Sequence, residues 1–168
     1  MNIVTCKYRS PFGEMTAAAR DDALVGLWFD GQKYYPKDAP TWEVASDYPV
    51  LRELRAWLDG YFGGDNPAIT FELAPVGSEF RQAVWRILRE IPYGGATTYG
   101  AIAKRVATER GVPRFSAQAV GGAVGHNPIS ILIPCHRVVG ATGELTGYAG
   151  GLDKKRSLLD LERTTCAI

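Results

Sequence analysis

Residues 98–125, TYGAIAKRVATERGVPRFSAQAVGGAVG, carry the pattern of two short helices joined by a tight turn. Thr98 is suited to cap the first helix, and Gly111 is suited to end it. Pro113 lies in the turn, and Ser116 is suited to cap the second helix. Two helices joined in this way are typical of a helix-turn-helix.

A β-hairpin is expected after these helices. Val138 and Val139 are apolar, residues 140–143 have the composition of a turn, and residues 144–148 return as a short strand. A helix pair followed by a hairpin predicts a winged helix-turn-helix, which is a nucleic-acid-binding fold.

The second helix of the pair is unusual for a DNA-reading helix because its side chains are small. The residues expected to face the core are Ala117, Val120, Gly121 and Val124, and those expected on the opposite face are Gln118, Ala119, Gly122 and Ala123. Most of the latter are too short to reach base edges in a major groove. Close approach to a nucleic-acid backbone and tight helix–helix packing both explain this composition, and both remain open.

The first half of the chain is expected to form a small antiparallel sheet with one helix. The expected strands lie at residues 2–8, 15–19, 24–29 and 69–73. The helix begins at Pro49 and ends at Gly63, and its expected apolar stripe is Leu51, Leu54, Leu58, Tyr61 and Phe62. Residues 74–77 form a linker to a further helix capped by Ser78. We find no chemistry in this half, and the tryptophans expected in its core are Trp28, Trp42 and Trp57.

The bulk composition excludes several classes of protein. The 168 residues are 46% apolar, enough for a core, and the net charge is +1, so nucleic-acid binding would need a local patch. Three widely spaced cysteines argue against a disulfide framework, and their spacing with the two histidines predicts no metal site. Without a signal peptide or a membrane-length apolar segment, we expect a cytoplasmic protein with no membrane partner.

The tetrapeptide Pro134-Cys135-His136-Arg137 places a thiol and an imidazole side by side after the apolar residues 129–133. Two potential cations beside a cysteine favour the thiolate, its nucleophilic form. An inert packing role is the alternative, because free cysteines are among the most buried residues. Neighbouring side chains do not face each other, so a cooperating pair would need a bridging water or a sharp turn.

A final helix is expected from about Asp153 to Arg163, with Leu158 and Leu159 on its apolar face. Glu162 follows these leucines by four and three residues and therefore falls on the buried face, where a carboxylate needs a partner. His136 is a candidate partner, which would give a Cys–His–Glu relay. A solvated glutamate at a frayed helix end is the alternative.

Three blocks, in order and spacing, resemble the O6-alkylguanine-DNA alkyltransferases, which are the methylated-DNA–protein-cysteine methyltransferases. The blocks are SAQAVGGAVGHNP at 116–128, IPCHRV at 133–138 and LTGYAGG at 145–151. The resemblance is strong over about residues 78–163, and SPFG at 10–13 and LWF at 27–29 are similar to the N-terminal domain of bacterial members.

The resemblance implies an α+β fold and a DNA-repair activity. A ribonuclease-H-like sheet-and-helix domain would occupy residues 1–75, and a winged helix-turn-helix domain would occupy residues 76–168. The activity would be an irreversible, single-turnover transfer of an alkyl group from O6-alkylguanine in double-stranded DNA to Cys135, with O4-alkylthymine as a further candidate lesion. We expect a monomer without cofactors, and the zinc of some relatives is not expected because its ligands are missing.

The resemblance also implies the roles of individual residues. Cys135 would accept the alkyl group, activated by Glu162 and by His136 through a water. Tyr99 would donate a proton to the purine, and Asn127 would hold the turn before the active site. The implied substrate-binding residues are Tyr99, Asn127, Val138, Tyr148 and Ala149, and the implied DNA-binding residues are Ser116, Gln118, Ala119, Gly122 and Arg137.

Gln118 departs from the family pattern, which has an arginine that fills the gap left by a flipped base. Glutamine is shorter and uncharged but can still hydrogen-bond an orphaned base. We therefore expect the difference to affect the efficiency of base flipping more than the alkyl transfer itself. A branch of alkyltransferase-like proteins lacks the cysteine, and Cys135 argues against that branch. Two other classes stay open: a cysteine hydrolase that uses Cys135 and His136, and a non-catalytic winged-helix DNA binder with Cys135 as packing.

Overall fold

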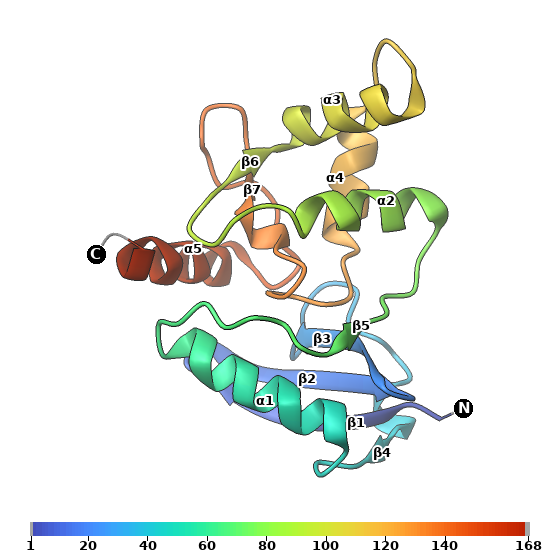
Figure 1. Cartoon of the computed structure of the whole chain (residues 1–168), viewed down its shortest axis with the longest axis vertical. Coiled ribbons are helices and arrows are strands. Elements are labelled where there is room, and N and C mark those ends of the chain that lie inside the picture. The colour runs from blue at the N-terminus through green and yellow to red at the C-terminus, as the bar shows by residue number, and fades with distance from the viewer. Residues whose placement is uncertain (1, 167–168) are drawn as a thin grey trace.

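The computed structural model describes residues 2–166, and its N-terminal part is a sheet built on a three-strand meander (Figure 1). The strands β1 (Val4–Ser10), β2 (Gly13–Arg20) and β3 (Ala23–Phe29) pair antiparallel, as predicted. Two short parallel edge strands, β4 (Glu43–Val44) and β5 (Glu72–Leu73), complete the order β4-β1-β2-β3-β5. The strand expected at 69–73 is therefore limited to its last two residues.

Helix α1 (Pro49–Phe62) packs across this sheet (Figure 1). Proline at its first position suits a helix start because the missing N–H would have had no partner there, and Gly63 follows its end. Of the predicted apolar stripe, Leu51, Leu54, Leu58 and Tyr61 are buried and Phe62 is half-buried. Trp28 is buried as expected, whereas Trp42 is only half-buried.

The C-terminal part is helical and carries the predicted helix pair. Its helices are α2 (Glu79–Leu88), α3 (Tyr99–Arg110), α4 (Ala117–Gly125) and α5 (Leu152–Cys166). The predicted caps are confirmed, because the side chains of Ser78, Thr98 and Ser116 each accept a backbone hydrogen bond in the first helical turn. None of the helices among residues 2–166 is long and apolar enough to cross a membrane.

The predicted hairpin after Cys135 is wrong. Strand β7 (Val138–Val139) pairs in parallel with β6 (Thr97–Thr98), and residues 144–148 form no strand. The physical reason is Lys155, whose ammonium donates to the carbonyl oxygens of Thr146 and Gly147 at 2.7 and 3.1 Å. These carbonyls belong to a loop held by α5 rather than to a strand ladder.

Helix α4 faces the core differently from the prediction. Val120, Ala123 and Val124 are buried, whereas Ala117 is exposed, so Ala123 and Ala117 exchange their expected faces. The indole N–H of Trp85 on α2 donates to the carbonyl of Ala123 at 2.9 Å in a buried position. Small side chains on α4 therefore serve close packing against α2 while one face stays exposed.

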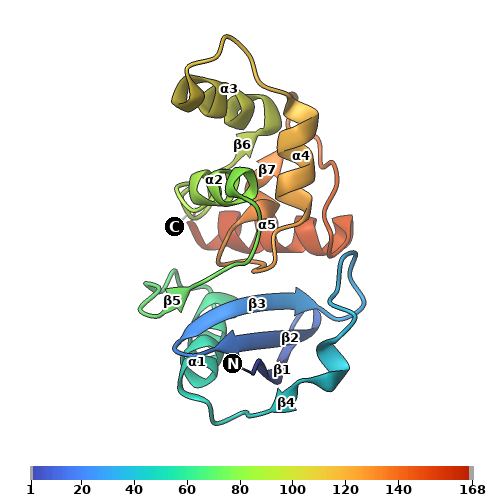
Figure 2. The same ribbon diagram turned by 90° about the vertical axis from the view of Figure 1, so that its right-hand side faces the viewer.

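Figure 2 shows the helical part of the chain lying next to the N-terminal sheet. Backbone hydrogen bonds join the two parts. The Leu27 N–H donates to Pro128, and Leu27 accepts from the Ser130 N–H, both at 2.9 Å, which adds the segment after α4 to the edge of β3. The Lys33 N–H donates to the Ala149 carbonyl at 3.0 Å. The segment that leads to Cys135 is thus anchored on the N-terminal sheet.

We predict that Trp85→Phe destabilises the fold by about 1–3 kcal/mol, because it leaves the buried Ala123 carbonyl without a donor. Urea denaturation at neutral pH measures this loss. Trp57→Phe is the control, since Trp57 donates to Pro67 in a partly buried position and should cost less. Equal losses in the two variants would contradict a special role for the α2–α4 hydrogen bond.

Candidate active site

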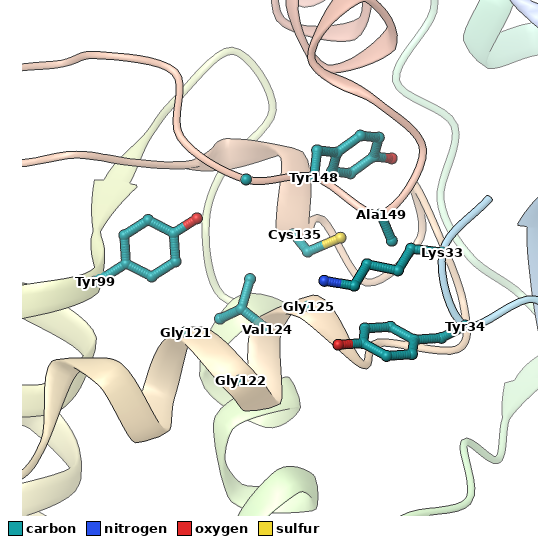
Figure 3. Close-up of a pocket in the computed structure, with 11 residues that line it drawn as sticks. Lys33, Tyr34, Tyr99, Gly121, Gly122, Val124, Gly125, Cys135, Tyr148 and Ala149 are labelled. Carbon is teal, nitrogen blue, oxygen red and sulfur yellow. The ribbon is translucent and has the colours of Figure 1, made fainter.

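A cavity of about 380 Å³ opens beside Cys135 and is lined by residues from five segments of the chain (Figure 3). Tyr99 comes from the start of α3, and Tyr148 and Ala149 come from the loop before α5. Part of the wall is the backbone of α4, where glycines leave room. The lining residues are Lys33, Tyr34, Tyr99, Gly121, Gly122, Val124, Gly125, Cys135, Gly147, Tyr148 and Ala149.

Cys135 begins a single 3-10 turn, η2 (Cys135–Arg137), at the end of a buried segment. Asn127 holds this segment: its amide donates to the carbonyls of Ile129 and Ile133, and its oxygen accepts the Ile129 N–H at 3.0 Å. Ile131 adopts a left-handed backbone conformation with φ of 72°, which is rare for a β-branched residue. Asn127 therefore lies under the active-site segment, in the place expected for a residue that holds this turn.

The carboxylate of Glu162 joins the elements around the site. Its Oε2 receives His136 Nε2 and the Tyr61 hydroxyl, each at 2.6 Å, and Arg137 Nη2 at 3.0 Å. Its Oε1 accepts from Arg137 Nε at 2.8 Å and from the Gly94 N–H at 3.2 Å. We call Glu162, Tyr61, Gly94, His136 and Arg137 the Glu162 cluster. The predicted burial of Glu162 is confirmed, since its side chain is 0% exposed.

The Glu162 cluster fixes the proton positions of the buried imidazole. Burial alone would raise the pKa of Glu162, but hydrogen bonds from His136, Arg137 and Tyr61 outweigh it and hold the pKa well below its usual range. Burial lowers the pKa of His136, although Glu162 opposes this shift. An ionised carboxylate only accepts, so the neutral imidazole carries its proton on Nε2. Its Nδ1 is buried and has no partner among residues 2–166.

The resting state of Cys135 differs from the thiolate that the adjacent cations suggested. Burial raises the pKa of the thiol, and the Asn127 amide and the Lys155 charge only partly oppose it. Arg137 cannot supply the expected charge because its guanidinium donates to Glu162 and to the Ile91 carbonyl, at 2.7 Å for the latter. The thiol is therefore protonated at rest, and its activation requires a base.

Three of the expected contact residues lie elsewhere. Asn127, expected among the substrate-binding residues, is buried with its amide bound to Ile129 and Ile133 and does not line the cavity. Arg137, expected to bind DNA, is buried with its donors engaged inside the protein. Val138 is fully buried in β7 and does not line the cavity. The structure does bring Tyr99, Tyr148 and Ala149 to the cavity wall, and leaves Gln118, Ala119 and Gly122 exposed on α4.

Four further residues lie near the site and were not predicted from the sequence. Lys33 and Tyr34 come from the loop after β3, and the Tyr34 ring stacks on His126 with centroids 3.8 Å apart. Lys155 is buried on α5, and burial lowers its pKa to about 8. Tyr61 reaches Glu162 from α1. A buried position for Lys155 follows from its spacing three residues before Leu158. No sequence pattern predicts that Lys33, Tyr34 and Tyr61 of the N-terminal part extend to the site.

A buried cysteine beside a carboxylate-held imidazole, at the base of a cavity in a helix-turn-helix domain, defines a cysteine-dependent protein of the nucleic-acid-binding type. Comparison with known families agrees. Residues 79–164 match the 6-O-methylguanine DNA methyltransferase DNA-binding domain, and residues 3–75 match the ribonuclease-like domain of the same family.

Individual relatives support the same assignment. A methylated-DNA–protein-cysteine methyltransferase of Mycolicibacterium paratuberculosis is 46% identical over 92% of this chain and 88% of its own, and one of Haemophilus influenzae is 41% identical over 93% and 84%. The Mycobacterium tuberculosis OGT crystallised with DNA has a TM-score of 0.82 and 38% identity over 98% of this chain and 94% of its own. The chain belongs to the 6-O-methylguanine DNA methyltransferase family.

We predict that Glu162→Gln lowers the free energy of unfolding by about 3–5 kcal/mol at pH 7, because it leaves the Arg137 charge buried without a counter-ion. The folded-state pKa of Glu162 is depressed, so its stabilisation is present above the ordinary value of 4.5 and is lost as the pH falls below it. Denaturation of wild type and variant should therefore converge in acid. Glu90→Gln is the control: Arg105 also lowers the pKa of Glu90, but this pair is exposed, so the variant should differ little from wild type at any pH. A difference that stays constant with pH for Glu162→Gln would contradict the assignment.

Proposed function

We propose that this protein repairs O6-alkylguanine in double-stranded DNA by transferring the alkyl group to Cys135 in a single turnover. One observation carries the proposal: the Cys135 thiol lies at the base of an accessible cavity, next to an imidazole whose neutral tautomer is set by Glu162. Membership of the family supports the same reaction. The order of events follows from the protonation states at the site.

Activation begins with proton transfer from the Cys135 thiol to His136 Nδ1 through one water molecule. Neighbouring residues do not face each other directly, so a bridge of this kind is needed. The imidazolium that forms is stabilised by the Glu162 carboxylate, which stays ionised because of its hydrogen bonds. Thiolate and imidazolium therefore appear together, although burial disfavours each of them alone.

Substitution then takes place at the alkyl carbon. The thiolate sulfur forms a bond to carbon, the carbon–O6 bond breaks, and its electron pair moves to the guanine. Tyr99 suits the role of donor to the departing base, because burial raises the pKa of its hydroxyl and keeps it protonated. The product thioether has no route back to a thiol, so each molecule acts once.

DNA would meet the exposed face of α4. The lesion oxygen lies on the pairing edge of guanine, so the base must leave the stack to reach Cys135. The side chains of Gln118 and Ala119 are exposed on this face, and they are too few and too short to read a sequence. Binding without base readout suits a protein that must inspect any sequence through phosphate contacts.

The domain boundary and the oligomeric state belong to the same proposal. We place the boundary at residues 75 and 76, within the segment that links β5 to α2. We propose that the protein acts as a monomer. The Ser116 side chain caps α4, and its contribution to DNA binding would be to fix the helix start.

Incubation with duplex DNA that contains O6-methylguanine should add one methyl group per chain, and peptide mass spectrometry should find it on Cys135. Cys135→Ser should abolish transfer while DNA binding stays largely intact. Cys166→Ser is the control, because Cys166 is exposed and should be dispensable. Alkyl groups on Cys6 or Cys166 would falsify the proposal, repeated turnover would indicate a hydrolase, and no adduct would indicate a DNA binder.

We predict that Gln118→Arg strengthens duplex binding and speeds duplex repair, because it adds a cation and a longer side chain on the DNA face. One new phosphate contact should steepen the slope of log affinity against log salt by about 0.9. Free O6-alkylguanine base needs no flipping, so its rate should hardly change. Arg114→Ala is the companion variant, because Arg114 is exposed in the turn before α4 and could already supply this cation. Equal rate changes on duplex and on free base in Gln118→Arg would contradict the prediction, because they would place residue 118 in the chemical step.

A further inference from the structure

The N-terminal domain reaches the proposed relay through one hydroxyl group. Tyr61 lies on α1, and its hydroxyl donates to Glu162 Oε2 at 2.6 Å across 101 residues of sequence. The side chain is 1% exposed, and its ring stacks on Trp57 with centroids 5.3 Å apart and planes at 12°. Edge contacts with Phe62 and Tyr93 fix the ring from two further sides.

We propose that Tyr61 is a positioning residue for alkyl transfer: by sharing Glu162 Oε2 with His136, its hydroxyl limits how strongly the carboxylate holds a proton on the imidazole. The inference rests on the proposed function, and it gives the N-terminal domain a part in the reaction. The domain would then set the reactivity of Cys135 without contacting the alkyl group.

The number of donors on Glu162 explains why the sharing matters. A carboxylate offers about four lone-pair sites, and Glu162 receives five hydrogen bonds. Three of them converge on Oε2, so each donor weakens what that oxygen offers to the others. His136 and Tyr61 approach at the same 2.6 Å and are therefore the closest competitors.

Tyr61 remains a donor over the working pH range. Burial, with the Glu162 charge beside it, raises the pKa of the phenol far above its usual range. Glu162 also does not depend on Tyr61 for its orientation, because Arg137 and Gly94 hold it from the other side. Removal of the hydroxyl therefore leaves the Glu162 carboxylate in place and increases the negative charge that Oε2 offers to His136.

The other charged and titratable groups near His136 and Glu162 stay in place in such a variant. Arg137 belongs to η2 and also lies over the Tyr93 ring at 5.8 Å, and Lys155 faces the site from α5. The titratable and charged groups that act on this pair are Tyr61, Arg137, Tyr148 and Lys155. Only the first of them is removed by substitution at residue 61.

The test is Tyr61→Phe, followed by the rate of Cys135 modification between pH 5 and 9. Two reactions are measured on the intact protein: methyl transfer from duplex DNA, and alkylation by iodoacetamide resolved at Cys135 by peptide mass spectrometry. Without the hydroxyl, Oε2 stabilises the imidazolium better, so His136 keeps its proton to higher pH and cannot accept one from Cys135. The acid limb of both profiles should move to higher pH, with rates relative to the plateau about 2- to 10-fold lower on that limb.

Tyr8→Phe is the matched control. It removes a hydroxyl that donates to Asp59 at 2.7 Å in the same domain, away from the Glu162 cluster. It should leave the pH profile unchanged even where its loss of stability is similar. A purely structural role for Tyr61 would lower the rate by one factor at every pH or leave it unaltered, and either result overturns the inference. Wild-type protein that transfers no methyl group would instead overturn the proposed function, while the iodoacetamide profile would still test Tyr61.

Discussion

The structure depends on one buried carboxylate. Glu162 is 0% exposed and accepts hydrogen bonds from α1, from the segment after α2 and from the 3-10 turn that carries Cys135. A buried charge of this kind is stable only when its partners are complete, so the two domains and the active-site turn must assemble together. The same contacts set the imidazole tautomer and keep Arg137 away from the protein surface.

Reactivity at Cys135 follows from a pair of groups rather than from a resting thiolate. Burial disfavours the charge on the thiol and on the imidazole separately, and proton transfer between them creates both charges beside an ionised Glu162. A protein that acts once gains from this arrangement, because a protonated thiol is protected from unrelated electrophiles. Lys155 adds a second constraint, since it holds the loop that forms one cavity wall.

Local patterns in the sequence predicted much of the fold and part of the site. Caps at Ser78, Thr98 and Ser116 and the apolar stripe of α1 are governed by neighbouring residues, and they were predicted correctly. The hairpin at 144–148 failed because Lys155, on the helix that follows it, donates hydrogen bonds to the carbonyl groups of Thr146 and Gly147. Tyr61 and Lys33 were not predicted for a different reason: their contacts depend on how the two domains meet, which the periodicity of the sequence does not encode.

The protonation of His136 at rest is the most direct test of these relations. Nitrogen-15 NMR of the histidine-labelled protein at pH 7 distinguishes the two neutral tautomers from the imidazolium, and His136→Gln identifies the signal against His126. A neutral ring with its proton on Nε2, retained as the pH falls below the ordinary histidine value of 6.5, is expected from the carboxylate contact and from burial. A neutral ring with its proton on Nδ1, or an imidazolium at pH 7, would contradict the role assigned to Glu162.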